Sequence, residues 1–252
     1  GKGSSLLVSI LLRPDLPPGH LAVVPLACAL SLAAALEEVA GFRPGLKWPN
    51  DLVVGERKMA GILAETDLVG GEVRGIVVGA GVNIGPGSFP PELADLATTA
   101  ELVAGQPVER GALLVAYLVA LEGAYRSLLG TGGPEALLEA CRVACVTLGR
   151  EVRVEVPGGT LRGTAETLGA GGELVVMGPG GERESVSAGD VVHLRDASQW
   201  GSSCAPRSTG PEGRRTEGRP PALSSPSIAP GGPPVADAPR PPWPPSRRCS
   251  SR

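Results

Sequence analysis

Apolar residues over the first 150 positions fall into short and long runs, which predict strands and helices respectively. Helices are expected at 21–39, 110–129 and 134–148, with a short polar helix around 92–104. Short runs bounded by Pro or Gly predict strands at 5–12, 46–48, 51–54, 59–66 and 73–82. Turn residues separate the strands from position 46 onward, so we expect an antiparallel meander.

After Gly149 the apolar residues alternate with a period of two. Five short segments separated by Gly-rich turns are predicted as strands, at 151–156, 161–168, 173–177, 182–186 and 191–194. Such a run of short strands is typical of a small SH3-like barrel. The predicted fold class is therefore α+β, with a mixed or antiparallel sheet and helices in residues 1–148 and a small barrel in residues 149–196.

The last segment, 197–252, differs in composition from the rest. It holds half of the 26 prolines, 8 of the 23 basic residues and only 3 of the 26 acidic ones. With almost no apolar run to bury, it is predicted to be disordered. The chain as a whole carries a net charge of −3, which gives no general attraction to nucleic acid.

Neither a membrane span nor a zinc site is predicted. Residues 20–36 lack Asp, Glu, Lys and Arg, but Pro25 interrupts them and they fall short of the roughly 20 apolar residues of a span. A buried helix is favoured. The five cysteines form no CxxC pair and have no histidine at metal-ligand spacing, which is typical of reduced thiols in a cytoplasmic protein.

Lysine is used in this chain at only three positions, Lys2, Lys47 and Lys58, whereas the other 20 basic residues are arginine. Lysine is a compact point charge that fits beside phosphate or carboxylate oxygens. Because Lys47 and Lys58 lie on one predicted hairpin, both ammonium groups are candidates for a single anionic site. A pair of surface lysines remains an equally open interpretation.

Two further segments carry candidate ligand-binding groups. Asn50-Asp51 follows Pro49, and Asp51 could help hold Mg²⁺ against a nucleotide, although Pro-Asx sequences also form plain turns. The Gly-rich stretch 79–85 contains Asn83 and would let a ligand approach the backbone. A β-bulge followed by a turn explains the same stretch without a ligand.

Taken together, these segments resemble the bacterial biotin–protein ligase family. The matching pieces are KWPNDL at 47–52, RKMAGILAE at 57–65 and VVGAGVNIG at 77–85. SLLVSILLRP at 5–14 looks like the family's preceding strand, and 149–195 stands where the family has its small C-terminal domain. The resemblance implies a ligase core like that of class II synthetases and a cytoplasmic enzyme. A homodimer is also expected to be possible.

The resemblance implies a two-step reaction on biotin, ATP and Mg²⁺. Biotin is activated to biotinyl-5′-adenylate and then passed to a lysine of a biotin carboxyl carrier protein. By the same resemblance, Lys58 and Lys47 are the catalytic candidates. Lys58, Asn50, Gly61 and Asn83 are expected to bind substrate, with Gly61 allowing close approach. Asp51 is expected beside the metal.

The chain also departs from the family pattern. A Gly/Arg-rich loop and the biotin-pocket residues that precede the first strand in the family are not found ahead of Gly1-Lys2-Gly3, so an N-terminally incomplete ligase is expected. No helix-turn-helix segment is present, and DNA binding is not expected. A noncatalytic remnant that binds nucleotide or carrier, and a lipoate ligase-like acyltransferase, are the alternatives.

Overall fold

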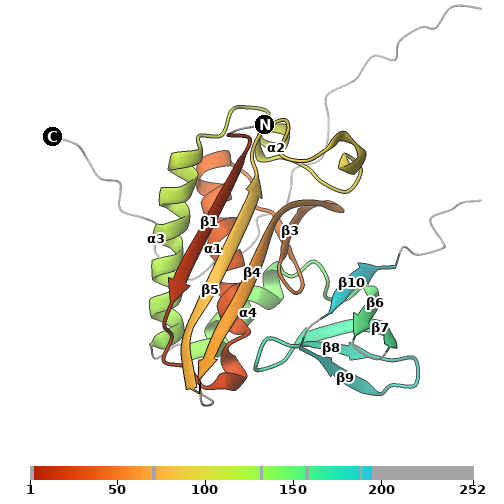
Figure 1. The fold of residues 1–252 in the computed structure, drawn as a ribbon. Helices are drawn as coiled ribbons and strands as arrows, with labels where there is room; N and C mark the ends of the chain where they lie inside the picture. Colours follow the sequence, from red (N-terminus) through yellow and green to blue (C-terminus); the bar gives the residue numbers. More distant parts are fainter. Residues whose placement is uncertain (1–2, 70–71, 131–132, 157–158, 188, 195–252) are drawn as a thin grey trace, which may run out of the picture. The chain divides into compact units, whose positions relative to one another are not determined.

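The computed structural model describes residues 3–69, 72–130, 133–156, 159–187 and 189–194. Within them are two five-stranded sheets and four α-helices, all in one compact unit spanning Gly1–Arg195 (Figure 1). The predicted boundary between residues 148 and 149 stays a prediction. The predicted disorder of 197–252 falls outside the described residues.

The first sheet has the strand order β1-β5-β4-β3-β2, and all of its strand pairs are antiparallel. The meander predicted from position 46 is therefore confirmed, and the first strand joins it beside the last. The strands are β1 (Ser5–Leu12), β2 (Gly45–Lys47), β3 (Asp51–Val54), β4 (Arg57–Val69) and β5 (Glu72–Asn83).

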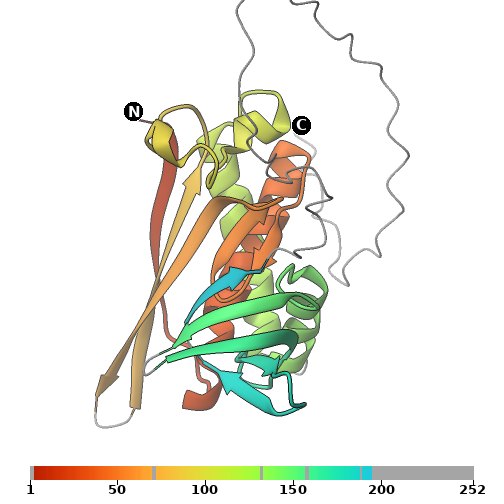
Figure 2. The same ribbon diagram turned by 90° about the vertical axis from the view of Figure 1, so that its right-hand side faces the viewer.

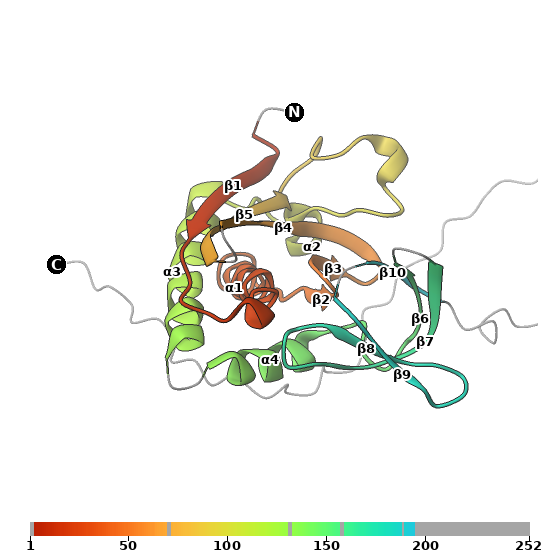
Figure 3. The same cartoon turned by 60° about the horizontal axis from the view of Figure 1, so that its bottom comes forward.

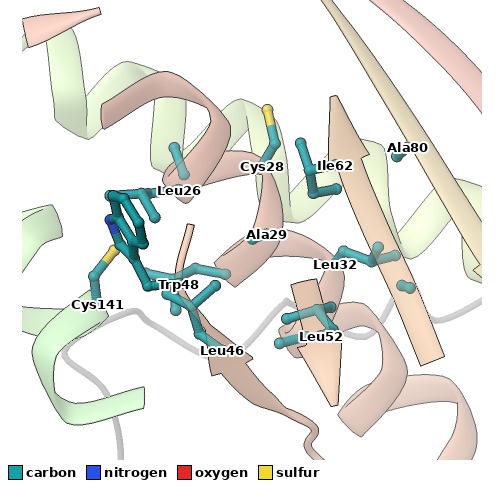
Figure 4. Close-up of a cluster of buried hydrophobic side chains, with 14 of the residues drawn as sticks. Leu26, Cys28, Ala29, Leu32, Leu46, Trp48, Leu52, Ile62, Ala80 and Cys141 are labelled. Carbon is teal, nitrogen blue, oxygen red and sulfur yellow. The ribbon is translucent and has the colours of Figure 1, made fainter. Parts of the chain in front are cut away.

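In the part of the chain that the structure describes, helices cover one face of this sheet (Figure 3). They are α1 (Val23–Ala40), α3 (Arg110–Leu129) and α4 (Gly133–Ala144), and the much shorter α2 (Ala100–Ala104) packs against α1. Because side chains alternate along a strand, every second residue points toward α1. Ile62 and Ala80 lie in that layer with Leu32 of α1 and Leu52 of β3 (Figure 4). This apolar layer is the core.

The opposite face of the sheet is open and partly apolar. Leu7 and Leu11 of β1, Leu63 of β4 and Val77 of β5 are exposed there, and Leu7 is exposed to 81%. Glycine occupies several of the intervening positions on β4 and β5. Leucine and valine on a solvated sheet face are unusual for a face with no partner. This face therefore needs a functional explanation.

The second sheet has the order β10-β6-β7-β8-β9 and is also antiparallel throughout (Figure 2). Its strands are β6 (Glu151–Val156), β7 (Gly159–Leu168), β8 (Leu174–Met177), β9 (Arg183–Val186) and β10 (Asp190–His193). All five predicted strands are confirmed. In this order β9 and β10 form the two edges, so closure into an SH3-like barrel stays a prediction.

Two predictions about helices are wrong in part. The helix expected around 92–104 is a 3-10 turn (η2, Pro91–Leu93) followed by the five-residue α2, which starts at the cap that Thr99 makes to the Leu102 amide. The helix expected to reach 148 ends at Ala144, because the next residues bond to β2 instead. Of the predicted mixed or antiparallel sheet, the antiparallel form is confirmed, and within the described residues parallel pairing occurs only as two isolated bridges.

Two helical segments are long and apolar enough to cross a membrane, Pro18–Ala40, which begins with the 3-10 turn η1 (Pro18–His20), and Arg110–Leu129. The most apolar 18 residues of the first segment are two-thirds buried inside the protein. Its fully buried leucines pack against the sheet and the other helices. The first is therefore the core helix that the sequence predicted.

The sheet-to-helix packing can be tested at Leu32, which is completely buried in α1. Leu32→Ala should lower the free energy of unfolding by about 2–5 kcal/mol, because it removes buried methyl groups and leaves a cavity. Urea denaturation followed by far-UV circular dichroism measures the change. Val143→Ala on α4 is the matched control, since Val143 is 74% exposed, and it should change stability by about 0.5 kcal/mol or less.

Candidate active site on the open sheet face

A cavity of about 430 Å³ lies on the open face of the first sheet. Three strands, β1, β4 and β5, together with the start of β3 form its walls and floor. Its lining residues are Leu7, Val8, Ser9, Asn50, Asp51, Lys58, Gly61, Ile62, Leu63, Gly79, Ala80 and Gly81. Four of the six residues predicted for the site, Lys58, Asn50, Asp51 and Gly61, are therefore brought together.

The charged end of the cavity is an ion pair between Lys58 and Asp51. The Lys58 ammonium lies 2.6 Å from Asp51 Oδ1, and the lysine side chain is half exposed whereas the aspartate is mostly buried. Asp51 and Lys58 come from adjacent strands, β3 and β4. The pair keeps a cation at the cavity wall with part of its ammonium facing solvent, where an anionic ligand can reach it.

Gly61 lies directly under this ion pair. A Cβ atom built at position 61 would stand 3.1 Å from Lys58 Cε and Nζ and 3.4 Å from Asp51 Oδ1. The absence of a side chain therefore lets the lysine lie close to the strand. In the structure it is the Lys58 side chain that lies close to Gly61. Close approach of a ligand to Gly61, the predicted role, stays a prediction.

Asn50 is held by two hydrogen bonds to one residue of β4. Its side-chain Nδ2 donates to the Ile62 carbonyl at 2.7 Å, and its own carbonyl accepts the Ile62 N–H at 2.8 Å. The side-chain amide thus links the residue before β3 to β4 by a hydrogen bond. A role for the Asn50 side-chain oxygen in ligand binding stays a prediction.

Lys47 and Asn83 do not line the cavity. Lys47 pairs with Asp51 and Asp51 with Gly61, so the strand register places Lys47 on the same face, one strand further from the centre. Asn83 lies two residues beyond Gly81 on β5, again on that face, opposite Ser5. Both residues flank the cavity, and their contact with a ligand stays a prediction.

The rest of the cavity is lined mostly by apolar residues and glycine, and the sequence did not single these residues out. Leu7 and Leu63 lie on its wall, and Leu63 is 63% exposed. In the sequence both belong to apolar runs that look like ordinary buried strands. The alternation within β1, together with the strand register, is the signal that separates the two faces. The lining of the cavity thus combines apolar side chains with one cation, Lys58, paired to Asp51.

A metal ion would have few protein ligands here. The residues that the structure describes contain no group of three or more His, Cys, Asp and Glu side chains placed to hold one. Asp51 supplies one carboxylate, with one oxygen already paired to Lys58. Mg²⁺ commonly takes one or two carboxylates, with phosphate oxygens and waters completing its shell. Asp51 therefore fits a metal that arrives with a nucleotide.

The segment that carries Asn50 and Asp51 contacts the second sheet through Trp48, which is almost fully buried. Its indole Nε1–H donates to the Gly172 carbonyl at 2.9 Å, and its backbone N–H donates to Thr147 Oγ1 at 3.1 Å. The indole ring packs beside Leu26 and Cys141 (Figure 4). Sequence reasoning missed Thr147 and Gly172, because nothing local marks a contact across about a hundred residues.

Known families match both parts of the chain. Residues 1–83 match the biotin/lipoate A/B protein ligase family, and residues 147–194 match the biotin protein ligase C-terminal domain. The first match covers β1 to β5 with all six predicted site residues, and the second covers β6 to β10. Both parts of the chain are therefore similar to biotin protein ligases.

Curated relatives agree with this placement. The chain is 31% identical over 178 residues to the bifunctional ligase/repressor BirA of Bacillus subtilis, covering 70% of this chain and 54% of that protein. It is 35% identical over 179 residues to the biotin–[acetyl-CoA-carboxylase] ligase of Mycobacterium tuberculosis, covering 70% and 63%. The chain thus spans between about half and two thirds of the length of these relatives.

Solved structures have the same fold. The biotin protein ligase of Aquifex aeolicus in complex with biotin and ATP superimposes with a TM-score of 0.66 at 26% identity, covering 77% of this chain and 79% of that one. The apo form of the same enzyme gives a TM-score of 0.68 at 25% identity. The arrangement of antiparallel sheets and helices is therefore that of biotin protein ligases.

Gly61 allows a test of the ion-pair geometry. Gly61→Ala should push the Lys58 ammonium away from Asp51, because the new Cβ would be closer to the lysine than an ordinary contact. Stability should change by less than about 1 kcal/mol, since alanine is compatible with an extended strand. Binding of ATP, measured by isothermal titration calorimetry, should weaken.

Gly123→Ala is the matched control for this substitution. A Cβ at position 123 on α3 would meet nothing within 4 Å, so ATP binding should not change. Equal ATP affinity in Gly61→Ala and the unsubstituted chain would show that the close approach of Lys58 to β4 has no role in ligand binding.

Proposed function

We propose that this chain catalyses ATP-dependent biotinylation, in two steps. An oxygen of the biotin carboxylate bonds to the α-phosphorus of ATP, and the bond to pyrophosphate breaks, leaving biotinyl-5′-adenylate. The amine of a carrier lysine then bonds to the acyl carbon, releases AMP and loses a proton. The relatives named as biotin ligases, and the solved relative that holds biotin and ATP, support the proposal.

The observation that carries the proposal is the Lys58 ammonium at the wall of a largely apolar cavity. The reaction needs two anions, a carboxylate and a triphosphate, held together while negative charge shifts between them. A fixed cation at that point lowers the repulsion and stabilises the charge in the transition state. The apolar wall at Leu7 and Leu63 suits the hydrocarbon part of biotin.

The other predicted residues take roles that follow from their positions. Asp51 keeps Lys58 in place, and its second oxygen is available to Mg²⁺ brought by ATP. Asn50 offers its side-chain oxygen at the same wall. Lys47 and Asn83, which flank the cavity on the same sheet face, are proposed to meet the phosphates and the nucleotide portion respectively.

The partner is proposed to be a biotin carboxyl carrier protein in the cytoplasm. Cys28, Cys141 and Cys145 are free and buried, which is typical of a reducing compartment. Burial raises the pKa of the Cys28 and Cys141 thiols to about 12, so these groups stay protonated and serve as core residues. A homodimer, and action without nucleic acid, stay predictions.

Of the two alternatives, the lipoate-specific one has less support. The family match over residues 1–83 is shared by biotin and lipoate ligases. The match over residues 147–194 is to a domain of biotin protein ligases. The noncatalytic alternative predicts binding of nucleotide without turnover, and this outcome is separable by experiment.

Lys58→Met should lower biotin-dependent exchange of labelled pyrophosphate into ATP by about a hundredfold or more, because the anionic transition state loses its cation. The same loss should appear in transfer of labelled biotin to a carrier domain. Methionine keeps the length and apolar stem of lysine. Arg162→Met, which removes an exposed cation from β7, is the matched control and should leave both rates unchanged.

The outcomes separate the candidates. Exchange that depends on biotin and vanishes in Lys58→Met supports the proposal. Exchange supported by lipoate but not by biotin identifies the acyltransferase alternative. Binding of ATP with no exchange identifies the noncatalytic one. Near-normal exchange in Lys58→Met would show that Lys58 has no role in the reaction.

A further inference from the structure

Four polar side chains from three separate segments meet beside the segment that carries the site. Thr147 is fully buried, and His193, at the end of β10, has a side chain only 8% exposed. His193 Nε2 lies 3.1 Å from Thr147 Oγ1, and His193 Nδ1 lies 3.2 Å from Arg150 Nη1. Arg150 in turn donates to Glu56 Oε1 at 2.6 Å, in the turn between β3 and β4.

The hydrogen-bond pattern determines the form of the imidazole. A guanidinium can only donate, so the Nδ1 atom that faces Arg150 must accept. The ring proton then lies on Nε2 and donates to Thr147 Oγ1. That hydroxyl oxygen also accepts the Trp48 backbone N–H, and its two lone pairs are then both used. His193 is therefore neutral in this arrangement.

The charges around His193 reinforce the neutral form. Burial lowers the pKa of His193 most, and the cations Arg150 and Lys47 lower it further, while Glu56 opposes them. On β6, the strand beside β10, the residue opposite is the apolar Val152. Since the unfolded chain takes up this proton more readily, the free energy of unfolding falls as pH drops below the ordinary value of 6.5.

We propose that His193 is a positioning residue for the active site, acting through Thr147 on the Trp48 amide. The proposal rests on the proposed function, because the residues that it positions are those of the site. Trp48 directly follows Lys47 and stands two and three residues before Asn50 and Asp51. Neutral His193 thus supports nucleotide binding, and protonated His193 weakens it.

The geometry explains why protonation acts against the arrangement. A proton added at Nδ1 would point at Arg150 Nη1, so two donors would face each other. The imidazolium would gain attraction to Glu56, whose Oε2 lies 3.6 Å from Nδ1, only by competing with Arg150. The ring would then move from the place where it meets Thr147, and the Trp48 amide would lose its supported acceptor.

The first test needs no substrate. The chain has two histidines, His20 and His193, so their ring signals can be resolved by NMR while pH is varied. The pKa of His193 should lie below 6.5 and should rise in Arg150→Gln, because a cation is removed and Glu56 is released. The protection factor of the Trp48 amide, which corrects its hydrogen-exchange rate for the intrinsic effect of pH, should fall below that pKa. The proposal would be overturned by a His193 pKa at or above 6.5, or by protection of the Trp48 amide that does not change when His193 is protonated.

The second test compares ATP affinity across pH in matched variants. His193→Gln keeps an N–H donor toward Thr147 without a titrating ring, so it should bind ATP normally at pH 7 and remove the weakening seen at low pH. His193→Leu and Thr147→Val should bind roughly threefold to tenfold more weakly at pH 7. Thr147→Ser, which restores the hydroxyl, should recover the affinity.

His20→Gln is the control for this series. It removes the other imidazole, so it should retain the pH profile of the unsubstituted chain; the titration of ATP itself is common to all variants and cancels in the comparison. Identical profiles in His193→Gln and the unsubstituted chain would refute the positioning role. Failure of every variant, and of the unsubstituted chain, to bind ATP would instead count against the proposed function, while Trp48 exchange still decides the role of His193.

Discussion

The packing of the first sheet on α1 constrains everything else in the molecule. An antiparallel sheet can bury one face and leave the other in solvent, and here the buried face takes the helices. Leu26, Leu32 and Leu36 of α1 are buried almost completely beneath the strands. The opposite face is thereby left free, and its exposed leucines at 7 and 63 form the wall of the cavity. The site is a product of this one-sided packing.

Trp48 links that sheet to the second one. Its indole is bound by the loop between β7 and β8, and its backbone is bound by the segment that follows α4. The same segment extends β2, because the Val146 N–H donates to the Leu46 carbonyl at 2.9 Å. Asn50, which bonds to Ile62, and Asp51, which pairs with Lys58, follow after Pro49 and line the cavity. Their position therefore depends on the small C-terminal sheet as well as on their own strands.

The sequence allowed much of this arrangement to be predicted, for identifiable reasons. The strand Ser5–Leu12 and the helix Arg110–Leu129 were predicted to the residue, because apolar runs bounded by Pro or Gly define their ends. The end of α4 at Ala144 was missed because the residues after it bond to β2, and the start of α2 was missed because the preceding Thr98 N–H donates to the Lys58 carbonyl. The same limit applied to Thr147 and His193. Lone polar residues show no local pattern, and only the fold brings them to Trp48.

Lysine rather than arginine at position 58 follows from the same geometry. The end of the Lys58 side chain lies over Gly61, and its ammonium is 2.6 Å from Asp51 Oδ1. A side chain at position 61 would crowd the lysine. A guanidinium is a wide planar fork and would need more space above the strand. In a chain that otherwise uses arginine for nearly all of its cations, a lysine at the one place where a compact charge is required is explained by sterics. The rarity of lysine was thus a structural signal already present in the sequence, although only the structure shows which lysine meets the constraint.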